Sequence, residues 1–136
     1  MGDIRKLVRL QFLVVGLFIL FKHFRADWLT DHSPEFWRVF LYSFPNFCEG
    51  VIGVFILTGI GIYFRAKLYH SISYKVLYFI AAGMALIYTI TQEVKLHHLG
   101  GKNIYDPYDV LFSILGVGVG LLIVMRMQPL VKPSNL

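Results

Sequence analysis

Long stretches without a charged side chain dominate this sequence. Four such stretches are bounded by Arg9 and Lys22, Arg38 and Arg65, Lys75 and Glu93, and Asp109 and Arg126. Glu49 is the one charged residue inside them. A helix that crosses a bilayer needs about 17–25 mostly apolar residues. The sequence therefore predicts an all-α membrane protein with four transmembrane helices in one bundle, near residues 7–24, 43–64, 74–95 and 108–126.

The first of these segments is the shortest and needs its flanks to reach spanning length. We expect it to cross the bilayer with Arg9 and Lys22 extending their charged ends toward the interfaces. Composition agrees with a membrane protein, because only 15% of the 136 residues are charged and mean hydropathy is +0.63. A soluble domain is about 25% charged. The single cysteine, Cys48, excludes a disulfide-stapled module. We expect one integral membrane domain over residues 1–136.

Small and aromatic residues follow the pattern of membrane helices. Gly116 and Gly120 form a small-xxx-small spacing that allows close helix packing, which we expect within the chain. Tyrosine and tryptophan concentrate at membrane interfaces. Those that flank the apolar segments are Trp28, Trp37, Tyr63, Tyr69, Tyr74, Tyr105 and Tyr108.

The basic residues set the predicted orientation. An even number of spans puts both termini on one side, and that side carries eight Lys and Arg residues against five on the other. The positive-inside rule therefore places the N and C termini in the cytoplasm. The acidic residues are distributed the other way, since Asp3 is the only one on the predicted inner side.

Three polar clusters converge on the predicted outer face. Helix two is expected to begin there with Pro45 and to carry Glu49 about one turn further on, helix three to end there, and helix four to begin there. The candidate functional residues are Glu49, Gln92, Glu93, Asp106 and Asp109. Carboxylates crowded together attract cations and protons. A carboxylate inside a span is by default a functional residue.

Each candidate also has a structural interpretation. Glu49 could join Lys95 or Arg38 in an ion pair at the interface. Asp106 could cap the fourth helix, with Pro107 at its first position and Asp109 in its first turn. Glu93 and His97 have i,i+4 spacing and chemistry suited to a metal, but no tight ligand cluster supports one. We predict no metal and no cofactor.

The C-terminal half resembles the VanZ-like family of small bacterial membrane proteins. The resemblance rests on Gln92-Glu93, a short loop with a basic residue, Asp106-x-x-Asp109, and the glycines from Gly116 to Gly120. The departures are the order of Gln92 and Glu93, Lys102 in place of an arginine in the loop, Ser113 in place of an asparagine in helix four, and the lack of an Asp-Lys-x-x-His motif near the first loop. The resemblance implies a protein of the bacterial inner membrane with a role linked to the cell envelope and to teicoplanin-type glycopeptide resistance.

These observations lead to one expected function and two alternatives. The carboxylate cluster is expected to act on or recognise a cell-envelope component, such as a lipid-linked or cell-wall head group. The alternatives are a small proton or cation transporter or channel that uses Glu49, and a structural subunit of a larger membrane complex. Beyond membrane lipid and such a head group, no partner is predicted, nucleic acid included, and the sequence leaves catalysis and oligomeric state open.

The predicted orientation can be tested by thiol labelling. With Cys48 replaced by Ser, Gly101→Cys in intact cells is expected to react with a membrane-impermeant thiol reagent, and His70→Cys is expected not to react. The opposite pattern would place the carboxylates on the cytoplasmic side.

Overall fold

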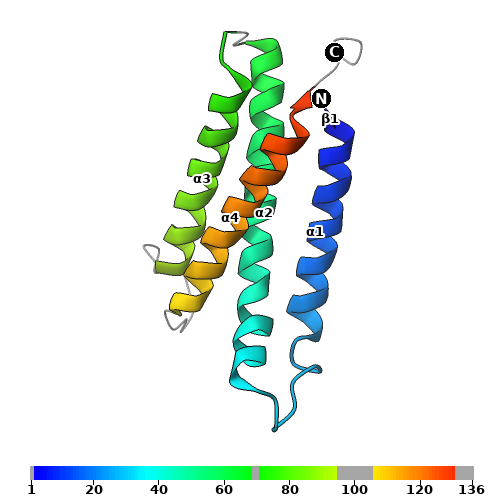
Figure 1. Cartoon of the computed structure of the whole chain (residues 1–136), viewed down its shortest axis with the longest axis vertical. Helices are drawn as coiled ribbons and strands as arrows, with labels where there is room; N and C mark the ends of the chain where they lie inside the picture. The colour runs from blue at the N-terminus through cyan, green and yellow to red at the C-terminus, as the bar shows by residue number, and fades with distance from the viewer. Residues whose placement is uncertain (1, 69–70, 95–105, 131–136) are drawn as a thin grey trace.

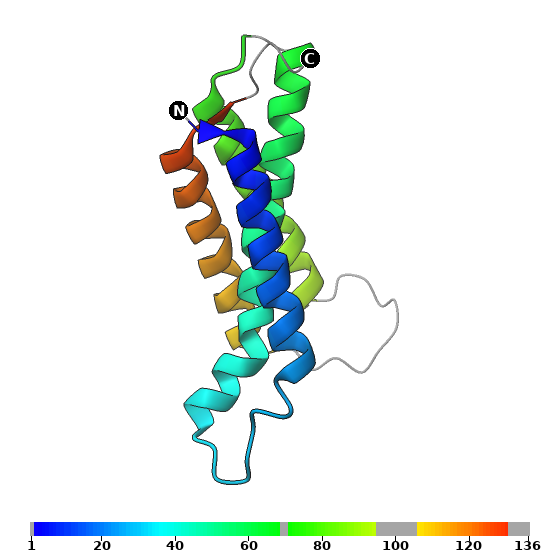
Figure 2. The ribbon, with the colours of Figure 1, turned by 90° about the vertical axis from the view of Figure 1, so that its right-hand side faces the viewer.

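The computed structural model describes residues 2–68, 71–94 and 106–130. Its helices are α1 (Ile4–Phe24), α2 (Glu35–Lys67), α3 (Tyr74–Val94) and α4 (Pro107–Met127), and its strands are β1 (Gly2–Asp3) and β2 (Pro129–Leu130). The helices lie side by side along one long axis (Figures 1 and 2). The predicted all-α class is confirmed.

Three helices of the described chain, α2, α3 and α4, are long and apolar enough to cross a membrane. The exterior is apolar as well. Among the described residues, exposed large hydrophobic side chains outnumber buried ones, and Phe12 and Ile87 are 72% and 67% exposed. Water does not favour contiguous apolar surface of this extent, whereas lipid does. These helices indicate a membrane protein.

Helix α2 begins earlier than the sequence suggested. The expected start near residue 43, with Pro45 at the entrance, is wrong, because α2 begins at Glu35 directly after Pro34 and runs for 33 residues. Pro45 lies buried inside the helix. At about 1.5 Å per residue α2 is about 50 Å long, against about 30 Å for the hydrocarbon core of a bilayer. Part of α2 therefore has to extend beyond a bilayer that it crosses.

The strands tie the two ends of the described chain together. β1 pairs with β2 in parallel, Gly2 opposite Pro129 and Asp3 opposite Leu130. This places the start of α1 beside the end of α4 (Figure 1). We call this the terminal end of the bundle; it also holds the end of α2 and the start of α3. The opposite end, where α2 and α4 begin, is the distal end.

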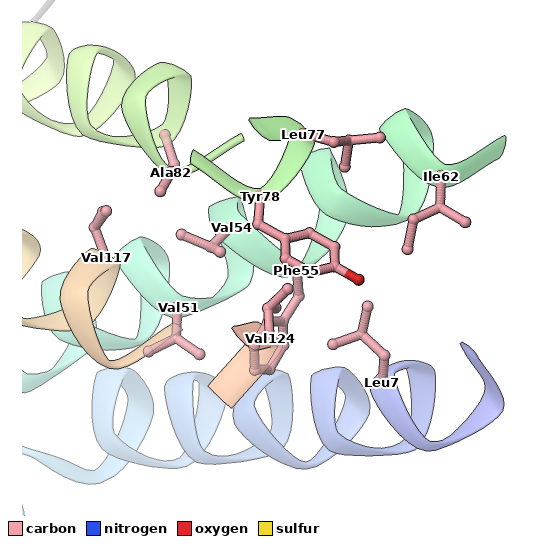
Figure 3. Packing of buried hydrophobic residues seen from close by; sticks show 11 residues of the cluster. Leu7, Val51, Val54, Phe55, Ile62, Leu77, Tyr78, Ala82, Val117 and Val124 are labelled. Atoms are coloured by element: carbon pink, nitrogen blue, oxygen red, sulfur yellow. The ribbon is translucent and has the colours of Figure 1, made fainter. Parts of the chain in front are cut away.

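Helix α2 is the centre of the packing, since α1, α3 and α4 all contact it. In Figure 3, Tyr78 of α3 and Val124 of α4 lie against Phe55 of α2, with Leu7 of α1 on the other side. The Tyr78 hydroxyl donates a hydrogen bond of 3.3 Å to the carbonyl oxygen of Pro129. This bond attaches β2 to the apolar core.

The closest helix contact joins the backbones of α2 and α4. A Cβ atom on Gly50 would lie 2.6 Å from the carbonyl oxygen of Ser113, and one on Gly116 would overlap the carbonyl of Phe47. One turn further, a Cβ on Gly120 would lie 3.1 Å from Cβ of Val54. Backbone atoms cannot move aside as flexible side chains do, so only glycine fits at Gly50 and Gly116 without a shift of the helices.

Replacing Gly116 by alanine is therefore expected to destabilise the protein by about 1–3 kcal/mol, the usual effect of an extra methyl group in a packed interior. Gly118→Ala is the matched control, because nothing lies within 4 Å of the Cβ position there. Thermal unfolding of the detergent-purified proteins measures the stability of both variants against the wild type. Equal melting temperatures for the two variants would contradict this contact.

Candidate functional site

Glu49 lies inside α2, toward the distal end. It follows Pro45 by four residues, as the sequence shows, but it is 14 residues beyond the start of the helix at Glu35. That separation corresponds to about 21 Å along the helix axis. Its side chain is half-buried. Glu49 is therefore deeper in the bundle than a helix starting near Pro45 would have placed it.

Two charges from other helices act on Glu49. They are Lys22 near the end of α1 and Asp109 in the first turn of α4. Lys22 attracts the Glu49 carboxylate, while Asp109 repels it. Three helices thus contribute one charged group each to the same electrostatic neighbourhood, which we call the distal charge cluster (Glu49, Lys22 and Asp109).

The carboxylates of this cluster lack direct partners in the described part of the chain. The Glu49 side chain makes no hydrogen bond or ion pair there. Oδ1 of Asp109 is buried and has no hydrogen-bond partner among the described residues. A buried polar atom without a partner loses about 1–3 kcal/mol of hydrogen bonding with water. Both carboxylates can therefore accept hydrogen bonds from a bound group.

Of the two cations that could pair with Glu49, Arg38 has another partner. Arg38 instead donates a hydrogen bond of 3.3 Å to the backbone oxygen of Asp31. Lys95 lies outside the described residues. Among the described residues, the cation shown to act on Glu49 is Lys22, which the sequence indicated only as the flank of a span. The sequence could have indicated this contact, because α1 and α2 are consecutive and run in opposite directions. The end of α1, where Lys22 lies, is therefore beside α2.

Asp106 has the structural role that the sequence allowed. Its side chain accepts a hydrogen bond of 2.9 Å from the backbone N–H of Tyr108, and Pro107 occupies the first position of α4. A cap of this kind satisfies one of the unpaired N–H groups at a helix start. Asp106 therefore orients the first turn of α4, and with it the Asp109 side chain.

Gln92 and Glu93 lie at the distal end of α3. Gln92 is exposed and Glu93 is half-buried. In the described ranges no three His, Cys, Asp or Glu side chains are grouped so as to hold a metal ion. The polar and glycine residues between α3 and α4 that lie outside the described residues include His97, His98, Gly100, Gly101 and Lys102.

Aromatic rings from three helices pack together at the same end of the bundle as the distal charge cluster. Phe21 of α1 packs on Phe44 of α2 with ring centres 4.3 Å apart. The ring centres of Phe40 of α2 and Phe112 of α4 are 6.2 Å apart. Lys22 lies over the ring of Phe18, 5.0 Å from its centre. The distal charge cluster thus combines one cation with two carboxylates that have no hydrogen-bond partner shown among the described residues, beside aromatic rings from α1, α2 and α4.

Comparison with protein-family models, with curated proteins and with solved structures finds no match to this chain.

Proposed function

We propose that the chain is a VanZ-like protein of the bacterial inner membrane in which all four helices cross the bilayer and both termini are cytoplasmic. The support for an even number of crossings is the pairing of β1 with β2, since it joins the start of α1 to the end of α4. The excess of Lys and Arg on the terminal side supports the orientation.

The proposed span of α1 rests on its exposed surface. Phe12, Leu13 and Ile19 are between 58% and 72% exposed, although α1 packs against α2 along its length. Its 21 residues correspond to about 31 Å, which matches the hydrocarbon core. Arg9 and Lys22 are both exposed and lie toward opposite ends of the helix, where long cationic side chains can reach the interfaces.

We infer that the distal charge cluster recognises a cell-envelope head group that carries ammonium or hydroxyl groups. The observation that carries this proposal is the buried Oδ1 of Asp109, which has no hydrogen-bond partner in the described part of the chain and lies in the same electrostatic neighbourhood as Glu49 and Lys22. Carboxylates accept hydrogen bonds from ammonium and hydroxyl groups, and a charged acceptor makes such bonds about twice as strong. Lys22 can in turn donate to an oxygen of the head group.

The aromatic residues of α2 indicate how deep in the bilayer Glu49 would lie. Trp37 and Tyr63 of α2 are 26 residues apart, which corresponds to about 39 Å and agrees with a bilayer that includes its interfacial regions. Glu49 is 12 residues from Trp37 and 14 from Tyr63, so it lies close to the middle of this span. A group bound by Glu49 would therefore reach about 18 Å inward from the level of Trp37.

The proposal predicts that Glu49→Gln and Asp109→Asn each abolish function without reducing the amount of protein in the membrane. The assay is the teicoplanin sensitivity of a susceptible bacterium expressing the chain, and the wild-type chain is expected to raise the inhibitory concentration. Glu93→Gln is expected to abolish function as well. Glu35→Gln is the control, because Glu35 is an exposed carboxylate at the start of the same helix.

Other outcomes would overturn the proposal. Full activity of Glu49→Gln, or equal loss with Glu35→Gln, would show that the cluster is not the site. Loss of the protein from the membrane would assign the carboxylates a folding role. A Glu49-dependent proton flux into liposomes containing the purified protein would favour the transporter instead.

A further inference from the structure

A cavity of about 530 Å³ opens at the terminal end of the bundle, far along the helices from the distal charge cluster. The end of α2, the start of α3, the end of α4 and β2 surround it. Its walls include Arg65, Ser73, Tyr74, Lys75, Gln128 and Leu130. The lining thus combines cations, hydroxyl and amide groups, and apolar side chains.

The charge of this cavity is positive. Arg65 and Lys75 are the charged residues in its described lining, and no Asp or Glu is present there. Contacts within the same end of the bundle position the Arg65 guanidinium, and two of them involve described residues. Its Nε donates a hydrogen bond of 2.5 Å to the carbonyl oxygen of Ile72, and its central carbon lies 3.7 Å from the centre of the Tyr74 ring. Arginine held in this way is a preformed site for a planar or tetrahedral oxyanion.

An apolar groove of about 170 Å³ shares Arg65 with this cavity. It lies between α2 and α3 and includes Leu57, Gly61, Leu77 and Ile80. From Arg65 it extends two turns along α2, toward the middle of that helix. Ile80 is 53% exposed, so the groove faces the surface of the bundle.

Glycine at position 61 makes room for the Leu77 side chain in the wall of this groove. A Cβ atom on Gly61 would lie 2.9 Å from a methyl group of Leu77. A larger side chain at this position would displace Leu77 and fill the space between the two helices. The groove has the apolar lining and the direction that one hydrocarbon chain of a membrane lipid requires.

We propose that the terminal end binds an anionic phospholipid, with the phosphate at Arg65 and Lys75 and one acyl chain in the groove between α2 and α3. Charge complementarity and the shared Arg65 carry this assignment. The other basic side chains at this end, among them Arg5, Lys6, Lys67 and Arg126, attract anionic lipid to the surface without selecting it. The site is independent of the distal charge cluster.

The test measures lipid retention by the full-length protein purified in detergent, using native mass spectrometry. The probes are phosphatidylglycerol and phosphatidylcholine with identical acyl chains. We expect phosphatidylglycerol to be retained in preference, and Lys75→Gln to reduce its affinity about tenfold. Lys67→Gln is the matched control, because Lys67 lies at the same end of the bundle but outside the cavity lining.

Two further arms identify the source of the phosphate. Gly61→Leu is expected to reduce retention of phosphatidylglycerol, because it blocks the groove, and inorganic phosphate at millimolar concentration is expected not to displace the lipid. Thermal unfolding of each variant checks that a loss of bound lipid is not a failure to fold.

The proposal is overturned if both lipids are retained equally or if Lys67→Gln has the same effect as Lys75→Gln, which would indicate attraction by the surface as a whole. If inorganic phosphate displaced phosphatidylglycerol and the Gly61→Leu variant retained as much of this lipid as the wild type, the cavity would be assigned to a soluble phosphate compound instead.

Discussion

The backbone contact between α2 and α4 is the constraint on which the arrangement of this bundle depends. Gly50 and Gly116 lack a Cβ atom where one would collide with backbone atoms of the opposite helix. In a membrane, helices gain little from burying apolar surface against one another, so van der Waals contact over a close approach supplies much of the association. Helix α2 also packs against α1 and α3. The α2–α4 pair is therefore the centre against which the other two helices pack.

The same contact determines what the distal end can do chemically. Gly50 directly follows Glu49, and Gly116 lies two helical turns beyond Asp109. The close approach therefore brings two carboxylates from separate helices into one electrostatic neighbourhood, where Lys22 of α1 joins them. At the terminal end the chemistry is reversed, because Arg65 and Lys75 line a cavity without a described carboxylate. One bundle thus presents opposite charge preferences at its two ends.

Much of the helical architecture could be predicted from the sequence, because charged residues bound the apolar stretches. The start of α4 follows from Asp106 and Pro107, whose side chains have strong positional preferences. The start of α2 at Glu35 has a local signal in Pro34, but Pro45 carries the same signal nearer to the apolar stretch, and only packing decides that Pro45 lies inside the helix. The pairing of β1 with β2 joins segments of two residues each and leaves no periodicity to detect. Of the candidate site residues, Asp109 and Glu49 are brought together, whereas the part played by Lys22 required the three-dimensional arrangement of α1.

A double-mutant cycle on the free energy of unfolding tests most directly whether Glu49 and Asp109 share one site. The four proteins are the wild type, Glu49→Gln, Asp109→Asn and the double variant, with Glu35→Gln combined with Asp109→Asn as the control cycle. Removing either carboxylate also removes its repulsion of the other, so the double variant should gain less stability than the sum of the single changes, by more than about 0.5 kcal/mol. The control cycle should be additive. Additive effects of Glu49→Gln and Asp109→Asn would contradict the convergence of the two carboxylates.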